Sequence, residues 1–151
     1  MTTRISSASA RWLKDTVTGS GTISTESGAL SDTPLTWPAR IGEQAGCTPE
    51  EMLAAAHAGC FAMACSFALS SAGHMPEQLD VRAEAAFEFT GTGASVTSMH
   101  LYVDGNVPGI TDAQFQELAA GAKDGCPISA VFQGNVEILL DANLVSEVAA
   151  S

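Results

Sequence analysis

The fold is decided by residues 48–71, which read TPEEMLAAAHAGCFAMACSFALSS. The stretch opens with helix-start signals, because Thr48 suits the N-cap, Pro49 the first helical position and Glu51 the third, where an acid closes a capping box. After this first turn the side chains are apolar nearly all round the helix, a pattern typical of a helix inside a structure. Its roughly 20 residues, at about 1.5 Å each, span about 30 Å. The stretch therefore predicts a long, buried central helix.

The chain before this helix predicts a hairpin and an extended arm. Residues 10–13 and 21–26 are short strand-like runs in a segment rich in Gly, Ser and Thr, with turn residues between them. The arm covers residues 35–41, where Pro38 favours extended geometry for the residue before it. Arg40 lies on this arm.

The chain after the helix predicts a second hairpin, a second helix and a last strand. Apolar and charged residues alternate in 79–90 and, more loosely, in 95–103, whereas 111–123 has helical spacing. Residues 126–132 form a turn or a short helix, and 135–140 form the strand. The order of two strands, long helix, two strands, helix and strand predicts an α+β protein with an antiparallel sheet.

Length and charge limit the classes of protein to which the chain can belong. A chain of 151 residues with no linker fits a single domain, residues 1–151, with a core of its own. Six Lys and Arg against 17 Asp and Glu give a net charge of -11, which disfavours nucleic acid and anionic membrane surfaces as partners. The first residues lack the apolar run of a signal peptide. We therefore expect a cytoplasmic protein.

Four cysteines, at positions 47, 60, 65 and 126, are too few and too irregularly spaced for a secreted disulfide scaffold. In a reducing compartment such cysteines are buried core residues, metal ligands or redox catalysts. Cys60 and Cys65 point about 140° apart on a helix and do not form a natural pair. We interpret Cys65 as a core residue and Cys47 as a loop thiol.

Cys60 is the candidate nucleophile, and it needs a cation. A thiol in an apolar helix has a raised pKa and is a poor nucleophile until it is ionised. Arg40 is the candidate partner, because it leads into the helix among apolar neighbours and keeps its charge. Glu50, in the first turn, is placed to hold the guanidinium. The alternatives are that Arg40 is a surface cation and that Glu50 is an ordinary helix-start acid.

Cys126 is the candidate second thiol. It lies in the sequence DGCP, where Pro127 at a first helical position makes Cys126 the cap residue. Amides at a helix start favour a thiolate, which suits a cysteine that attacks a sulfenic acid. The local sequence is equally compatible with a small buried residue in a turn.

His57 lies three residues before Cys60 on the same helix face. The pair does not predict a metal site, because the other histidines stand alone and no CxxC is present. Phosphate-loop, GxGxxG and GxSxG motifs are absent as well. Two rivals to redox chemistry remain: a cysteine hydrolase or acyl-transferase that uses Cys60 with His57, and a binding domain in which all four cysteines are core.

Two cysteine motifs carry a resemblance to a known family. The segments GCTPEEMLAAAHAGCF (46–61) and AKDGCPIS (122–129) closely resemble the OsmC/Ohr family, and its OsmC branch in particular. GTISTESGAL (21–30) and VPGI (107–110) extend the match over nearly the whole chain.

The resemblance implies an OsmC-like fold, an intertwined homodimer and a peroxidase without metal or cofactor. The implied substrates are organic hydroperoxides and, less well, hydrogen peroxide. By position in the motifs, Cys60 matches the peroxidatic cysteine, Cys126 the resolving cysteine, Glu50 the acid of the TPEE turn and Arg40 the arginine of the arm. The implied cycle passes through a Cys60 sulfenic acid and a Cys60–Cys126 disulfide, which a lipoyl or thioredoxin-like dithiol reduces. Cys47 departs from the family pattern, in which this position commonly carries a different small residue. Its thiol could compete as a disulfide partner.

Overall fold

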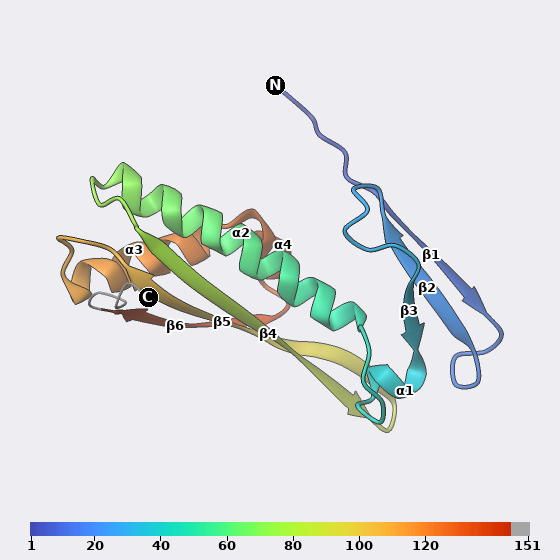
Figure 1. The fold of residues 1–151 in the computed structure, drawn as a ribbon. Coiled ribbons are helices and arrows are strands. Elements are labelled where there is room, and N and C mark those ends of the chain that lie inside the picture. Colours follow the sequence, from blue (N-terminus) through green and yellow to red (C-terminus); the bar gives the residue numbers. More distant parts are fainter. Residues whose placement is uncertain (146–151) are drawn as a thin grey trace. The chain divides into compact units, whose positions relative to one another are not determined.

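A computed structural model describes residues 1–145 of the chain. In it, residues 1–49 and residues 50–145 form two compact units, whose elements are labelled in Figure 1. A single domain over residues 1–151 stays a prediction, and its last part, 146–151, lies outside the described residues.

The first unit is a meander of three antiparallel strands. Its strands are β1 (Ala8–Leu13), β2 (Ser20–Thr25) and β3 (Thr33–Thr36), with β2 in the middle. Asp15 closes the turn between β1 and β2, because its carboxylate accepts two backbone N–H groups of the turn at 2.9 Å. The predicted first hairpin is therefore confirmed.

The predicted extended arm, residues 35–41, is only partly right. β3 supplies its first two residues, whereas α1 (Trp37–Arg40) is a single helical turn. The turn forms because the side chain of Thr36 caps it, accepting a hydrogen bond from the N–H of Ala39 at 3.2 Å. A proline in the first turn of a helix removes no helical hydrogen bond, so it does not prevent the turn. Arg40 is thus the last residue of a helical turn.

The second unit begins with α2 (Pro49–Ser71), which has the predicted start and length. Gly73 follows its last turn with a φ of +86°, a conformation that suits glycine. Four buried residues of α2 recur at every fourth position and form one stripe: His57, Phe61, Cys65 and Leu69. The predicted burial of the helix holds for this stripe.

The opposite face of α2 is exposed in the single chain. Met63 and Phe67 are 76% and 73% exposed. Among the described residues, α2 is the one helix long and apolar enough to cross a membrane, and 22% of its most apolar window is buried. The core helix of a soluble protein meets the same criterion, so length and composition do not decide what covers this face.

The second unit holds a three-stranded sheet in the order β4-β5-β6. β4 (Gln78–Thr90) and β5 (Gly93–Asn106) form the predicted second hairpin, whereas β6 (Glu137–Leu144) pairs with β5 in parallel. The prediction of a purely antiparallel sheet is therefore corrected at its last strand. The reason is the long helical connection between β5 and β6, since a crossover returns the chain in the same direction.

Two helices make this crossover. α3 (Asp112–Gly125) has the predicted N-cap, Thr111, whose hydroxyl accepts the N–H of Gln114 at 3.2 Å while the Gln114 side chain accepts the N–H of Thr111 at 3.0 Å. α4 (Pro127–Phe132) follows directly. The predicted helix and the short helix after it are both confirmed.

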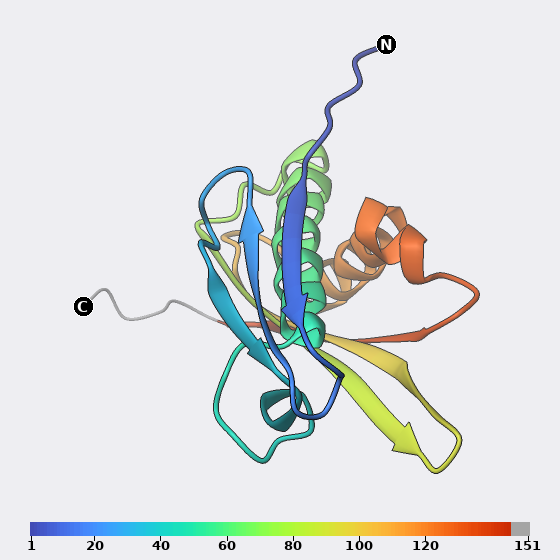
Figure 2. The same cartoon turned by 90° about the vertical axis from the view of Figure 1, so that its right-hand side faces the viewer.

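The core of the second unit lies between the helices and one face of the sheet. Buried side chains from α2, β5 and α3 form one cluster, to which Cys126 belongs, and Figure 2 shows α2 beside α3 and α4. Gly105 on β5 allows this packing, because a Cβ there would lie 2.6 Å from the ring of Phe115. The fold thereby holds α2 against the segment that joins α3 to α4.

Candidate functional site

The structure brings Cys60 and Cys126 together. Cys60 lies on α2 and is partly exposed, whereas Cys126 is fully buried between α3 and α4. Cys60 packs against the buried cluster that contains Cys126, each thiol shifts the pKa of the other, and both are free thiols. Two neighbouring thiols on separate elements are the arrangement from which a disulfide can form.

The surroundings shift the pKa values of the two thiols in opposite directions. Burial raises the pKa of Cys60, although a hydrogen bond from the backbone of Ile128 acts against it. Burial would also raise the pKa of Cys126, but hydrogen bonds from Ser129, Cys60 and Ile128 outweigh it and lower that pKa. Within the second unit alone, Cys126 is therefore the thiol more readily ionised, so Cys60 needs a positive group from elsewhere.

Cys65 has none of these partners. It is fully buried in the apolar cluster of the second unit, and burial raises its pKa to about 11. A thiol in this state is inert at neutral pH. The interpretation of Cys65 as a core residue is confirmed.

Glu50 lies in the first turn of α2, as predicted, and is 7% exposed. A buried carboxylate is stable only when other groups satisfy it. This burial distinguishes Glu50 from Glu51, its exposed neighbour in the same turn, and goes beyond what a simple helix-start acid requires.

Arg40 lies in the first unit on the wall of a cavity of about 290 Å³. The wall also includes the indole rings of Trp12 and Trp37 and the side chain of Cys47. Apolar rings around one guanidinium suit an organic molecule that carries a polar oxygen. Arg40 and Cys60 belong to different units, so their contact stays a prediction.

His57 pairs with a residue that sequence reasoning missed. Its Nε2 atom lies 2.8 Å from the hydroxyl of Ser129, and its ring packs edge-on against Phe132 at 5.2 Å between centroids. Ser129 belongs to the AKDGCPIS motif, but nothing in the motif indicates a partner 72 residues earlier. The pairing could be found only from the fold.

The contacts of His57 bear on two alternatives, a cysteine hydrolase and a metal site. A hydrolase would need a ring nitrogen of His57 on Cys60, whereas Nε2 is bonded to Ser129 and Nδ1 has no partner among the described residues. Across residues 1–145, no group of three or more His, Cys, Asp or Glu side chains is placed to hold a metal ion. His57 is thus a buried polar residue whose partner is Ser129.

Known proteins resemble this chain over most of its length. The family model for OsmC-like proteins matches residues 42–141. The chain is 39% identical over 137 residues to proteins named peroxiredoxin OsmC from Escherichia coli K12 and Shigella flexneri, which covers 91% of this chain and 94% of each relative.

Solved structures show the same fold. The organic hydroperoxide resistance protein OhrB of Bacillus subtilis superposes with a TM-score of 0.71 at 23% identity, covering 91% of this chain and 98% of that one. An OsmC-like protein from Mycoplasma pneumoniae reaches 0.72 at 16% identity, covering 94% and 98%. The resemblance in fold therefore extends over nearly the whole length of these relatives.

Proposed function

Because the chain belongs to the OsmC family, we propose that it is a cysteine-based peroxidase that reduces organic hydroperoxides and, less well, hydrogen peroxide. The observation that carries the proposal is that Cys60 packs against the buried cluster that contains Cys126, where each thiol shifts the pKa of the other. A partly exposed thiol beside a fully buried one is the arrangement expected when the first meets the peroxide and the second resolves it.

The reaction uses two thiols for each peroxide. The thiolate of Cys60 attacks one peroxide oxygen, the O–O bond breaks, and the other oxygen leaves as an alkoxide that takes up a proton to become an alcohol. Cys60 is then a sulfenic acid. Cys126 attacks its sulfur, hydroxide leaves and becomes water, and an external dithiol reduces the disulfide.

Arg40 and Glu50 serve the first step in this proposal. The shift of the Cys60 pKa shows that its unit does not favour the thiolate, and a guanidinium favours a nearby anion without losing its own proton. Glu50 holds that guanidinium in place. The two indole rings beside Arg40 support an organic substrate over a small polar one.

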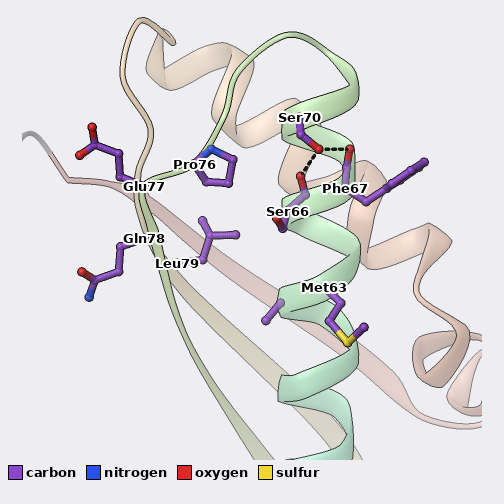
Figure 3. A pocket seen from close by; sticks show the side chains of 9 residues that line it. Met63, Ser66, Phe67, Ser70, Pro76, Glu77, Gln78 and Leu79 are labelled. Atoms are coloured by element: carbon purple, nitrogen blue, oxygen red, sulfur yellow. Dashed lines mark hydrogen bonds between the residues drawn. The ribbon is translucent and has the colours of Figure 1, made fainter.

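The peroxidase acts as a homodimer in this proposal. The exposed face of α2 borders a groove of about 640 Å³ between α2 and the segment that leads into β4, seen in Figure 3 with Met63, Phe67, Pro76 and Leu79 around it. So much exposed apolar surface on a helix requires a cover. A second copy of the chain is the cover that the family resemblance implies.

The four free thiols fit a reducing compartment, where a dithiol reductant such as a lipoyl or thioredoxin-like protein is available. We therefore place the protein in the cytoplasm.

Substitution of each cysteine tests the proposal. In a single-turnover reaction with an organic hydroperoxide, Cys60→Ser abolishes peroxide loss, because no other thiol occupies its position. Cys126→Ser consumes one equivalent and stops at a sulfenic acid, which a dimedone label detects by mass. Cys65→Ala is the matched control and keeps the wild-type rate. Steady peroxide turnover by Cys60→Ser would refute the proposal.

A further inference from the structure

The short helix α4 has one buried face, which begins at Cys126. Cys126 is the N-cap of α4, and Ser129 and Phe132 follow at every third position. All three side chains are buried, whereas that of Val131 is 72% exposed. Residues three apart lie on the same side of a helix, so Ser129 and Phe132 form one buried row that starts at Cys126.

His57 on α2 contacts this row at two points. Its Nε2 atom lies 2.8 Å from Ser129 Oγ, and its ring packs edge-on against Phe132 with 5.2 Å between centroids. His57 is fully buried and Ser129 is 3% exposed. The hydrogen bond joins residues that are 72 positions apart, so it connects α2 to α4 and does not shape either helix alone.

Packing alone does not require a hydrogen bond at this place. Two apolar side chains fill such a space without the desolvation of polar groups, and His57 Nδ1 has no partner among the described residues. A polar pair adds direction, because apolar contacts tolerate a small slide between helices, whereas a bond of 2.8 Å is lost when its atoms separate by about 1 Å. Buried polar groups fix the register of some packed helices in this way. The pair is therefore suited to hold α4 at one position on α2.

The two thiols stand at the same spacing from this hydrogen bond on both helices. Cys60 follows His57 by three residues on α2, and Cys126 precedes Ser129 by three residues at the start of α4. Three residues are slightly less than one helical turn, a rise of about 4.5 Å. Cys60 also packs against the buried cluster that contains Cys126. The hydrogen bond therefore lies about one turn from the place where the two elements bring their thiols together.

We propose that the hydrogen bond between His57 and Ser129 holds α4 on α2 so that Cys126 meets the oxidised Cys60, an inference that rests on the proposed function. In this step the Cys126 thiolate forms the S–S bond with an electron pair of its sulfur, while the S–O bond of the Cys60 sulfenic acid breaks. Hydroxide leaves with the electron pair of that bond and takes up a proton to give water.

His57 and Ser129 are positioning residues in this step. A disulfide forms only within a narrow range of separations and dihedral angles, so a slide of α4 along α2 slows its formation. The role requires no contact of either side chain with a reacting atom. Oxidation of Cys60 by the peroxide comes before this step and does not depend on the position of Cys126.

Rapid mixing of the full chain with an organic hydroperoxide separates the two steps. His57→Leu removes the hydrogen bond and keeps a side chain of similar size, so disulfide formation should slow about tenfold while Cys60 oxidation stays within about twofold. The reason is that misplacing reacting groups by about 1 Å slows a reaction by up to about a hundredfold. The slowing should be the same at every pH tested, because a change of position leaves the ionisation of the thiols as it is.

His57→Gln tests whether the hydrogen bond itself is responsible. Its amide N–H keeps a hydrogen-bonding group at a similar reach and should restore disulfide formation to within about threefold of the wild-type rate. If His57→Leu does not fold, Ser129→Ala breaks the same hydrogen bond and takes its place in the experiment.

Leu69→Ala is the matched control for lost stability. Leu69 lies on the same buried stripe of α2, about three turns beyond His57, so its truncation loosens the core without touching the hydrogen bond. Denaturant unfolding measures the free energy that each variant loses. A positioning role predicts the wild-type rate of disulfide formation for Leu69→Ala. If Leu69→Ala slows this step as much as His57→Leu does, at an equal loss of stability, the role of His57 is only structural.

A glutathione redox buffer tests the geometry without peroxide. Two thiols of the chain and one oxidised glutathione exchange to the Cys60–Cys126 disulfide and two reduced glutathiones, and a Cys47→Ser background leaves the loop thiol out of the reaction. His57→Leu should shift this equilibrium about tenfold towards the dithiol, whereas Leu69→Ala should leave it unchanged.

The outcomes distinguish this inference from the proposed function. An unchanged equilibrium together with an unchanged rate of disulfide formation, in His57→Leu or in Ser129→Ala, overturns the positioning role. A wild-type chain that forms the disulfide in the glutathione buffer but consumes no hydroperoxide refutes the proposed function, and the shift between wild type and His57→Leu then still decides whether the hydrogen bond positions the thiols.

Discussion

Cys60 packs against the cluster that contains Cys126, yet their surroundings shift the pKa values of the two thiols in opposite directions. Cys60 has one backbone donor against the effect of burial, whereas Cys126 has donors from Ser129 and Ile128 as well as from Cys60. Peroxide chemistry at Cys60 requires the reverse order of ionisation in the resting enzyme. The charge that reverses it has to come from a residue outside this group, and Arg40 is our candidate.

Substitution of Arg40 therefore acts on the first step alone. Arg40→Gln should slow Cys60 oxidation at neutral pH by tenfold to about a hundredfold, because loss of a neighbouring cation raises a thiol pKa by about one to two units. The later disulfide step should keep its rate. Rapid mixing with an organic hydroperoxide measures both steps.

Arg82→Gln is the control for this experiment. Arg82 lies on β4 with its side chain 60% exposed and paired with Glu84, so its loss should leave both steps unchanged. If Arg40→Gln oxidises Cys60 as fast as wild type, the source of the charge is another residue.

The raised pKa of Cys65 predicts how the stability of the fold changes at alkaline pH. Its pKa is raised from 9.0 to about 11 by burial, so the unfolded chain loses the Cys65 proton at a lower pH than the folded chain does. The contribution of Cys65 to the free energy of unfolding is fully present below about pH 9. It is lost as the pH rises towards about 11, and the loss amounts to roughly 2–3 kcal/mol at most. In Cys65→Ala, the melting temperature should fall less steeply over this range than in wild type. Parallel curves would contradict the assignment.

At the scale of elements, the signals that act locally could be read from the sequence. The helix start at Pro49, the N-cap at Thr111 and the hairpin around Gly91 each depend on residues a few positions apart, and the structure has all three. Each signal is a contact between neighbours in the chain.

The elements that were misjudged depend on distant contacts. β6 has an alternating burial pattern, which fits a parallel and an antiparallel neighbour equally well, so only the α3–α4 crossover sets its direction. α2 is apolar all round, so its sequence could not show which stripe meets the sheet. The pairing of His57 with Ser129 is of the same kind, because a 72-residue separation leaves no periodic signal.

The whole molecule presents an apolar helix face in an acidic chain. A net charge of -11 keeps the protein in solution, whereas Met63 and Phe67 on the exposed face of α2 favour association. In the homodimer that we propose, the second copy covers the apolar face and leaves the charges exposed.

Oligomeric state tests this account of the surface. Light scattering after size exclusion should give a dimer for wild type and a monomer for Phe67→Asp, because a buried unpaired charge at an interface costs several kcal/mol. Leu139→Asp is the control, since Leu139 is 39% exposed on β6 and should leave the dimer intact. A wild-type monomer that binds lipid vesicles through α2 would contradict the proposal.

The pairing of Cys60 with Cys126 is the central claim, and a disulfide map of the oxidised protein tests it most directly. After one equivalent of an organic hydroperoxide, digestion without reductant and mass spectrometry should find the peptide of Cys60 joined to that of Cys126, with Cys47 and Cys65 still free thiols. A disulfide between Cys60 and Cys47, or four free thiols after the peroxide has been consumed, would contradict the account.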